Sequence, residues 1–540
     1  MGERDDNRFI KNAAILSVAG IFVRALGAVY RIPLARIAGE EITGLYQMAY
    51  PIYSTLLAVS TTGPPIAIAK MVAERLALRK YKAAQQVFRL ALLSMGILGL
   101  LLTLLLTLTA PYLVRNVLGD ERALWSLLAM APAIVIISLV SALRGYFQGL
   151  QRLTPYALGQ MLEQVVRVGV ALGLGLVLLK GGRSEALVAG GISSGVSLGG
   201  LMGLMVLFFA YRRLTPVIAR NMKRDQSHFE RPSRVVREFA ALAVPITIGA
   251  VVMPLMQLID AAVVPRRLLS AGFTQPEATS LYGQLSGMAT PLVNLPQMFT
   301  VALVASLIPS IAEAMSLGRK QVMQQRSSLS LKLAMLFNLP AAVGLSVLAT
   351  PISTLLYGPV SGPGVGRPMA VLAIAIAFLA IQQTTSGVLQ GLGRTHVPVV
   401  NLFIGALVKL VSTYFLTAIP SLNIQGSALA TVLGFTVSST LNFLAMRRVS
   451  GISISLGKVF LRPLLATAGM GVVALYSFRW LSMSLSSNLS TLIAISLAMF
   501  VYGILVLLTG SLTAREMMAI PKIGRPLARL LLRLHLIVED

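Results

Sequence analysis

Apolar runs of about 20 residues recur from one end of this sequence to the other, and they constrain the fold more than any other feature. A helix of that length spans the hydrocarbon core of a bilayer. The runs are too long and too uniformly apolar for barrel strands, which alternate with a period of two and need only about ten residues. We therefore expect an all-α integral membrane protein with about 14 transmembrane helices. The fourteen runs cover residues 10–38, 46–76, 85–112, 123–150, 155–179, 186–211, 239–265, 279–315, 327–356, 368–392, 397–419, 424–446, 459–480 and 488–511.

Composition agrees with a membrane protein. The 540 residues are 56% hydrophobic and 12% charged, with a mean hydropathy of +0.79. Soluble domains are typically about 25% charged. The first run follows the charged segment MGERDDNRFIKN and does not end in a small-residue cleavage site, so we expect it to be retained as a helix.

The net charge of +27 comes from basic residues that are unevenly distributed along the chain, and this distribution indicates the membrane topology. If the N-terminus is inside, the inner segments carry 33 of the 46 Lys and Arg residues, the outer segments 8, and the helices 5. Loops rich in Lys and Arg stay on the cytoplasmic side. The sequence therefore predicts a multi-pass membrane protein with both termini cytoplasmic. It also predicts contact with anionic lipid headgroups and no nucleic-acid partner.

The sequence contains an internal repeat. Residues 148–150 (QGL) recur at 390–392, and Arg167 corresponds to Lys409 at the same offset of 242. Each half holds six predicted helices, an even number, so both halves enter the membrane from the same side. This predicts two parallel six-helix lobes followed by two C-terminal helices, a plan that recurs among transporters.

We expect five parts along the chain. They are the N-terminal lobe 1–213, a cytoplasmic basic linker 214–238, the C-terminal lobe 239–450, helices 13 and 14 in 451–511, and a basic amphipathic cytoplasmic tail 512–540. In the first lobe, Gly191, Gly195, Gly199 and Gly203 recur every four residues on one face of the sixth helix. Small residues let helix backbones approach closely, so this face predicts tight helix packing.

No enzymatic site is apparent. The chain has no cysteine, its three histidines lie far apart, and it has no phosphate-binding loop of the GxxxxGK[ST] type. The longest predicted hydrophilic connection, about 27 residues, is too short for a catalytic domain. We therefore expect neither an enzyme nor a cofactor or metal site.

Charged residues inside the apolar runs are the best candidates for function. A charge at a helix centre costs about 2.5–3.5 kcal/mol, so such residues normally face a bundle interior or a wet cavity. Six candidates are Arg24, Arg31, Glu163, Arg167, Asp260 and Lys409.

We predict that Arg24, Arg31 and Lys409 bind the substrate. Arg24 and Arg31 are seven residues apart and share a helix face, although Arg31 could instead reach toward the outer interface. Glu163, Arg167 and Asp260 are predicted cavity or gating residues. Glu163 and Arg167 are four apart, a spacing that also allows a structural ion pair. Asp260 and Lys409 could equally pair with residues of other helices.

Residues 22–75 and 144–168 resemble the multidrug/oligosaccharidyl-lipid/polysaccharide (MOP) exporter superfamily. Within it the sequence is most similar to the stage V sporulation protein B type of polysaccharide-biosynthesis protein, related to the MurJ lipid II flippases. The resemblance covers essentially the whole chain. It implies a flippase for undecaprenyl-linked cell-wall precursors, in which two lobes enclose a cationic cavity that opens alternately to each side, driven by an ion gradient or the membrane potential.

Arg24 lies where MurJ-type proteins keep a cavity arginine in helix 1. Those proteins also have cavity arginines in helices 2 and 8, and the corresponding segments here, 50–59 and 282–296, have none. Another lipid-linked oligosaccharide, for spore cortex or capsule, is therefore an alternative substrate to lipid II. An ion-coupled multidrug exporter and a non-transporting scaffold for wall or spore assembly are alternative functions.

Overall fold

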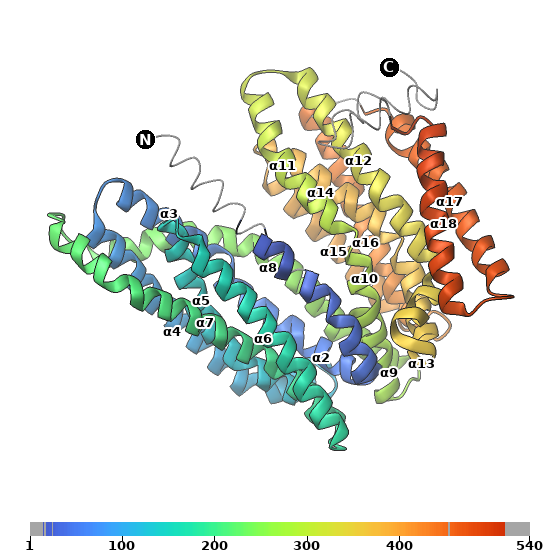
Figure 1. Cartoon of the computed structure of the whole chain (residues 1–540), viewed down its shortest axis with the longest axis horizontal. Helices are drawn as coiled ribbons and strands as arrows, with labels where there is room; N and C mark the ends of the chain where they lie inside the picture. The colour runs from blue at the N-terminus through green and yellow to red at the C-terminus, as the bar shows by residue number, and fades with distance from the viewer. Residues whose placement is uncertain (1–14, 16–17, 24, 452–453, 513–540) are drawn as a thin grey trace. The chain divides into compact units, whose positions relative to one another are not determined.

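Helices make up all the regular structure that the computed structural model describes, namely residue 15 and residues 18–23, 25–451 and 454–512. Figure 1 shows the chain. The predicted all-α class is confirmed. Arg24 and the predicted tail beyond residue 512 lie outside the described residues.

The chain forms two compact units, which are described separately. Unit 1 comprises residues 1–269 and 273–283, and unit 2 comprises 270–272 and 284–540. Unit 1 contains α2 (Arg31–Thr61), α3 (Gly63–Ala77), α4 (Tyr81–Leu113), η1 (Val114–Leu118), η2 (Glu121–Ala123), α5 (Leu124–Gly149), α6 (Leu153–Lys180), α7 (Glu185–Arg224), α8 (Pro232–Ser270) as far as Leu269, and α9 (Gln275–Tyr282). Unit 2 contains the rest of η3 (Gly283–Ala289), α10 (Thr290–Asn294), α11 (Gln297–Ser316), α12 (Lys320–Val347), α13 (Ala349–Leu372), α14 (Ala375–Gly391), α15 (His396–Leu416), α16 (Asn423–Ser450), η4 (Gly457–Leu461), α17 (Arg462–Leu481) and α18 (Ser487–Leu508).

The described helices account for the predicted crossings. Twelve are long and apolar enough to span a membrane, and the pair α13 and α14, bent by 44°, makes a thirteenth span. One of the twelve, Val18–Ala77, has 60 residues and is interrupted at Gly39, whose φ of +79° leaves the helical region. About 20 residues suffice for one crossing. Val18–Ala77 is therefore long enough for two crossings, and the 12 or 13 candidate spans of the described residues are close to the predicted number.

The two halves repeat in their helix contacts as well as in sequence. A Cβ added to Gly149 of α5 would lie 2.8 Å from the Cβ of Val72 on α3. A Cβ added to Gly391 of α14 would lie 2.8 Å from the Cβ of Ile311 on α11. Both glycines are needed for the same reason: a helix of the same half crosses there at backbone distance. The predicted repeat is therefore present in the packing.

The glycine stripe of α7 packs tightly, as predicted. Helices α6 and α7 lie side by side (Figure 1). A Cβ on Gly195 would lie 2.6 Å from the carbonyl oxygen of Arg167, and one on Gly199 would lie 2.7 Å from that of Glu163. The stripe brings the backbone of α6 against α7. This contact fixes the backbone positions of Glu163 and Arg167 on α6.

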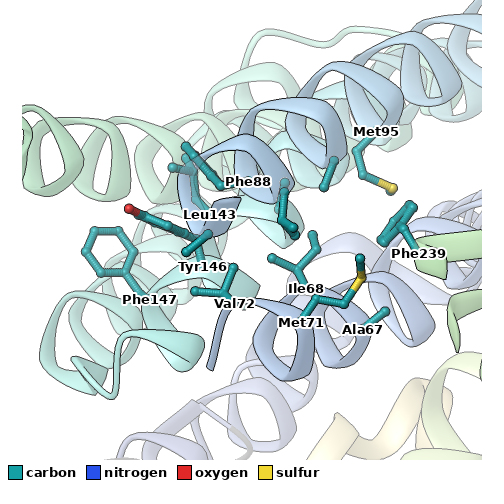
Figure 2. Close-up of a cluster of buried hydrophobic side chains, with 14 of the residues drawn as sticks. Ala67, Ile68, Met71, Val72, Phe88, Met95, Leu143, Tyr146, Phe147 and Phe239 are labelled. Atoms are coloured by element: carbon teal, nitrogen blue, oxygen red, sulfur yellow. The ribbon is translucent and has the colours of Figure 1, made fainter. Parts of the chain in front are cut away.

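Unit 1 has a continuous apolar core between α3, α4, α5 and α8 (Figure 2). Phe88 of α4 stacks on Tyr146 of α5 with ring centroids 4.1 Å apart. The Tyr146 hydroxyl donates to Oε1 of Gln85 at 2.7 Å, and Nε2 of Gln85 donates to the Tyr211 hydroxyl at 2.7 Å. The buried polar groups of this core are thus satisfied by one another, as burial requires.

Candidate functional site

A row of tyrosines lines one face of α2. Tyr46, Tyr50 and Tyr53 are spaced by four and three residues, which places them on one side of a helix. The rings of Tyr46 and Tyr50 stack with centroids 5.7 Å apart, and those of Tyr50 and Tyr53 are 6.0 Å apart. Tyr53 is completely buried. The row therefore forms part of the interior of unit 1.

Two arginines stand beside this row. Arg31, at the start of α2, interacts electrostatically with tyrosines of the row and with Arg167 of α6. Arg167 interacts with the same row, and also with the buried Tyr30 that precedes α2. The break at Gly39 redirects the chain, which lets residues on either side of it reach one site. We call this group the arginine–tyrosine site, composed of Tyr30, Arg31, Tyr46, Tyr50, Tyr53 and Arg167.

Neither arginine of the site is neutralised by a carboxylate. Within the described ranges, no Asp or Glu oxygen lies within 4.0 Å of a guanidinium nitrogen of Arg31 or Arg167. Arg167 stands midway along α6, so its charge lies near the centre of a membrane-spanning helix. An uncompensated charge at that depth is costly. Because Arg31 and Arg167 interact electrostatically, an anion bound near both would stabilise them.

The ion pair that the four-residue spacing allowed between Glu163 and Arg167 is not formed. Oε2 of Glu163 instead pairs with Nη2 of Arg144 on α5, at 2.7 Å, and both side chains are only 15% exposed. The Arg144 guanidinium also lies over the ring of Tyr156, 5.4 Å from its centroid. Spacing along one helix could not reveal this partner, because Arg144 comes from the preceding helix.

Asp260 and Lys409 belong to other helices. Asp260 is a partly buried residue of α8 in unit 1, and Lys409 is 7% exposed on α15 in unit 2. A Cβ on Gly434 of α16 would lie 2.8 Å from the Cβ of Lys409. In the same way, one on Gly199 would lie 2.9 Å from the Cβ of Arg167, so the repeat-related cations occupy equivalent packing positions. The binding and gating roles of all six residues stay predictions.

Three features of the interior were not predicted from the sequence. The tyrosine row is visible in the segment GLYQMAYPIYS of residues 44–54, where its helical spacing was the available signal. Arg144 was not among the six candidates, although it is the partner of Glu163. Lys332 was not among them either, although it is only 5% exposed on α12.

One end of unit 1 is held by ion pairs around Arg75. Its guanidinium bonds Glu230 at 2.7 Å and Glu238 at 2.9 Å, so the end of α3 is tied to the segment that leads into α8. Hydrogen bonds from Arg75 hold the pKa of Glu230 below its ordinary value, against a smaller opposing effect of burial. The Arg75 guanidinium is nearly buried, which makes this cluster more than a surface contact.

A second cluster surrounds Arg122, beyond the far end of α4. Arg122 pairs with Asp120 at 2.8 Å, with Glu185 at 3.4 Å and with Glu41. Asp120 also accepts a hydrogen bond of 2.8 Å from the Thr279 hydroxyl of α9. Burial raises the pKa of Asp120, but the hydrogen bonds it accepts outweigh burial and lower the pKa overall. The span Tyr81–Leu118, 38 residues long, separates the two clusters, which therefore close opposite ends of unit 1.

These features define a class: a multi-spanning helical membrane protein with an internal repeat and with two partly buried arginines in its first half. Residues 9–315 match the family described as "Polysaccharide biosynthesis protein", and residues 285–415 match the family described as "MatE". The chain belongs to the polysaccharide biosynthesis protein family, within the MOP superfamily that the sequence resembled.

Two curated proteins of Bacillus subtilis (strain 168) illustrate the relationship. The chain is 33% identical to Stage V sporulation protein B over 522 residues, which cover 96% of this chain and 99% of that protein. It is 26% identical to Lipid II flippase MurJ over 86% of this chain and 88% of that protein. The relationship therefore extends over nearly the full length of both relatives.

Solved structures share the fold. A structure of Lipid II flippase MurJ in an inward closed conformation matches with a TM-score of 0.68 and 17% identity, over 91% of this chain and 98% of that one. An inward-facing MATE family multidrug resistance transporter matches with a TM-score of 0.67 and 15% identity, over 82% and 98%. The two-lobe fold is thus common to proteins of different substrate classes.

Proposed function

We propose that this protein is a flippase that moves an undecaprenyl-diphosphate-linked saccharide, lipid II or a related cell-wall precursor, across the bacterial cytoplasmic membrane. The observation that carries the proposal is the arginine–tyrosine site, in which Arg31 and Arg167 have no carboxylate partner among the described residues. A lipid-linked diphosphate is an anion whose polar head does not cross hydrocarbon unaided. The site offers this head the positive charge and the hydrogen-bond donors that hydrocarbon lacks.

The chemistry of the two arginines suits a diphosphate. A guanidinium donates hydrogen bonds in a planar fork that matches phosphate oxygens in pairs. In a low-dielectric interior such charge-assisted bonds are stronger than in water. The tyrosines beside them add hydroxyl donors and flat apolar faces to the same site. An anion bound here would relieve the cost of burying two positive charges.

The relatives agree with this assignment. One curated relative is named a lipid II flippase, and another is named a sporulation protein. We propose that two lobes, with boundaries near 213 and 239, open alternately to each side around the substrate. We further propose that both termini are cytoplasmic, that anionic lipids contact the basic inner segments, and that an ion gradient or the membrane potential drives transport.

The alternative functions fit the site less well. A site for cationic drugs needs acidic groups, whereas the arginine–tyrosine site presents two positive charges. A scaffold without transport gives no reason to leave Arg31 and Arg167 unneutralised at such cost. Translocation is therefore the function that the site supports best.

Lipid binding tests the proposal directly. The purified protein should bind undecaprenyl diphosphate and should not bind undecaprenol, which has the same chain without the anion. In Arg31→Gln/Arg167→Gln the affinity for undecaprenyl diphosphate should fall by about 10- to 150-fold or more. The loss of one charge-assisted contact, about 1.5–3 kcal/mol, gives a decrease of that size, and the variant removes two guanidinium groups. Arg36→Gln is the matched control, because Arg36 is exposed on the same helix. Equal binding of both lipids by the wild type would refute the proposal.

A further inference from the structure

Helix α11 begins directly after an interruption of the helical structure. The predicted apolar run 279–315 is continuous in sequence, but the helix is interrupted at Leu295 and Pro296, and α11 starts at Gln297 in the centre of that run. Proline has no backbone N–H and ends or bends helices. In membrane transporters, discontinuous helices often form the substrate site, because a broken helix exposes polar groups inside the bundle.

Amide side chains gather directly after this break. Gln383 of α14 donates from Nε2 to Oε1 of Gln297 at 3.0 Å. One turn further along α11, Thr300 accepts from Nδ2 of Asn338 on α12 at 2.8 Å, and the same nitrogen donates to the carbonyl oxygen of Ala334 at 2.8 Å. Three helices of unit 2 thus meet through amides and a hydroxyl. We call Gln297, Thr300, Asn338 and Gln383 the amide cluster.

The cluster is incompletely satisfied. Nε2 of Gln297, Oε1 of Gln383 and Oδ1 of Asn338 are buried and have no hydrogen-bond partner among the described residues. Gln297 is 8% exposed and Asn338 is completely buried. A buried polar group without a partner costs about 1–3 kcal/mol in proteins, and no bulk water reaches hydrocarbon to relieve it. One amide nitrogen and two amide oxygens of the cluster can therefore each form a further hydrogen bond.

The free atoms select a neutral polar group. The two acceptor oxygens would repel an anion, and the free amide N–H group would repel a cation. A group that both donates and accepts, such as a sugar hydroxyl or an acetamido group, complements all three atoms. Phe299 and Phe337, which precede Thr300 and Asn338 in the sequence, are exposed, and their ring centroids are 3.9 Å apart. Apolar and aromatic surface with a few converging polar atoms is typical of small-ligand sites.

We infer that the amide cluster of unit 2 is a subsite for the neutral saccharide of the lipid-linked substrate, binding its hydroxyl or acetamido groups at some stage of transport. This inference rests on the proposed function and deepens it. Recognition is then divided by chemistry: the arginine–tyrosine site of unit 1 binds the diphosphate, and the amide cluster binds the sugar. A protein built this way discriminates between lipid-linked saccharides through uncharged hydrogen bonds.

The test removes the cluster without removing its packing. Gln297→Leu/Gln383→Leu deletes both partners of one hydrogen bond and two unpartnered atoms, so thermal stability should be unchanged or raised. Affinity for lipid II, used as the saccharide-bearing probe, should fall about 10- to 100-fold, the loss of two or three neutral hydrogen bonds. Affinity for undecaprenyl diphosphate, which has no sugar, should stay the same. Gln390→Leu, at an exposed position of the same α14, is the control.

A third probe separates this inference from the proposed function. The soluble and uncharged disaccharide of two N-acetylglucosamine units, followed by saturation-transfer NMR, should bind the wild type and Arg31→Gln/Arg167→Gln, but not Gln297→Leu/Gln383→Leu. That pattern supports the subsite even if undecaprenyl diphosphate fails to bind, which would count against the proposed function alone. A destabilised Leu variant that loses every ligand equally would show that the cluster is only structural. Disaccharide binding that survives in a stable Leu variant would also overturn the inference.

Discussion

Arg144 of α5 and Glu163 of α6 form an ion pair of 2.7 Å inside unit 1. The pair occupies the only carboxylate of α6, which would otherwise stand one turn from Arg167. We therefore predict a positioning role for Arg144, in which it holds Glu163 away from Arg167 and leaves the charge of Arg167 available. Because the Glu163 side chain is only 15% exposed, its carboxylate would be destabilised without Arg144 and would gain free energy by pairing with another cation.

Removal of Arg144 should weaken anion binding at the arginine–tyrosine site indirectly. In Arg144→Gln, Glu163 is released and can pair with Arg167 at the four-residue spacing. Affinity for undecaprenyl diphosphate should then fall about 10- to 150-fold, as if Arg167 itself were lost. Glu163→Gln in the Arg144→Gln background removes the competing carboxylate, so affinity should return. A merely structural role for Arg144 would give no such recovery, and unchanged binding in Arg144→Gln would refute the positioning role.

The glycine stripe predicts a steric effect on stability. Gly199→Ala places a Cβ 2.7 Å from the carbonyl oxygen of Glu163 and 2.9 Å from the Cβ of Arg167, so α6 and α7 must separate. Such overpacking costs about 1–3 kcal/mol, which should appear as a lower unfolding temperature in detergent. Gly173→Ala is the control on α6, where a Cβ meets nothing within 4 Å. It should be neutral or stabilising by up to about 1 kcal/mol. Equal effects of both substitutions would contradict the packing described.

The cluster around Arg75 predicts how stability depends on pH. The pKa of Glu230 is lower in the folded protein than its ordinary value of about 4.3, so its ionised form stabilises the fold. That contribution is complete above the ordinary pKa and is lost as the pH falls through the lowered value. Unfolding temperature should therefore decline below about pH 4. Glu230→Gln should flatten the decline, whereas the control Glu74→Gln, at an exposed carboxylate, should leave it unchanged.

The proposed topology can be tested with a single thiol, because the chain has no cysteine. His228→Cys and Ser316→Cys lie at exposed positions in predicted cytoplasmic segments, and Ser184→Cys and Ser421→Cys lie in predicted outer loops. In intact cells an impermeant maleimide should label the second pair and spare the first. Labelling of the first pair with protection of the second would invert the topology.

Much of the fold follows from the sequence, and much of the site does not. The long apolar spans and the glycine contacts of α7 are local consequences of apolar length and helical spacing, which a sequence displays directly. The pairing of Arg144 with Glu163 depends on how two helices meet, so spacing along one helix favoured Arg167 instead. The electrostatic interaction of Arg31 with Arg167 depends on the break at Gly39, where α2 changes direction between the predicted runs 10–38 and 46–76.

Translocation in proteoliposomes tests the central claim most directly. Fluorescent lipid II is placed in the membrane together with the purified protein, and the fraction that becomes inaccessible to an external quencher is followed over time. The account predicts that the wild type moves the lipid, that Arg31→Gln/Arg167→Gln, reconstituted in equal amount, does not, and that Arg36→Gln behaves as the wild type. Movement by the double variant at the wild-type rate would contradict the claim, as would failure of the wild type to move this or any other undecaprenyl-diphosphate-linked saccharide.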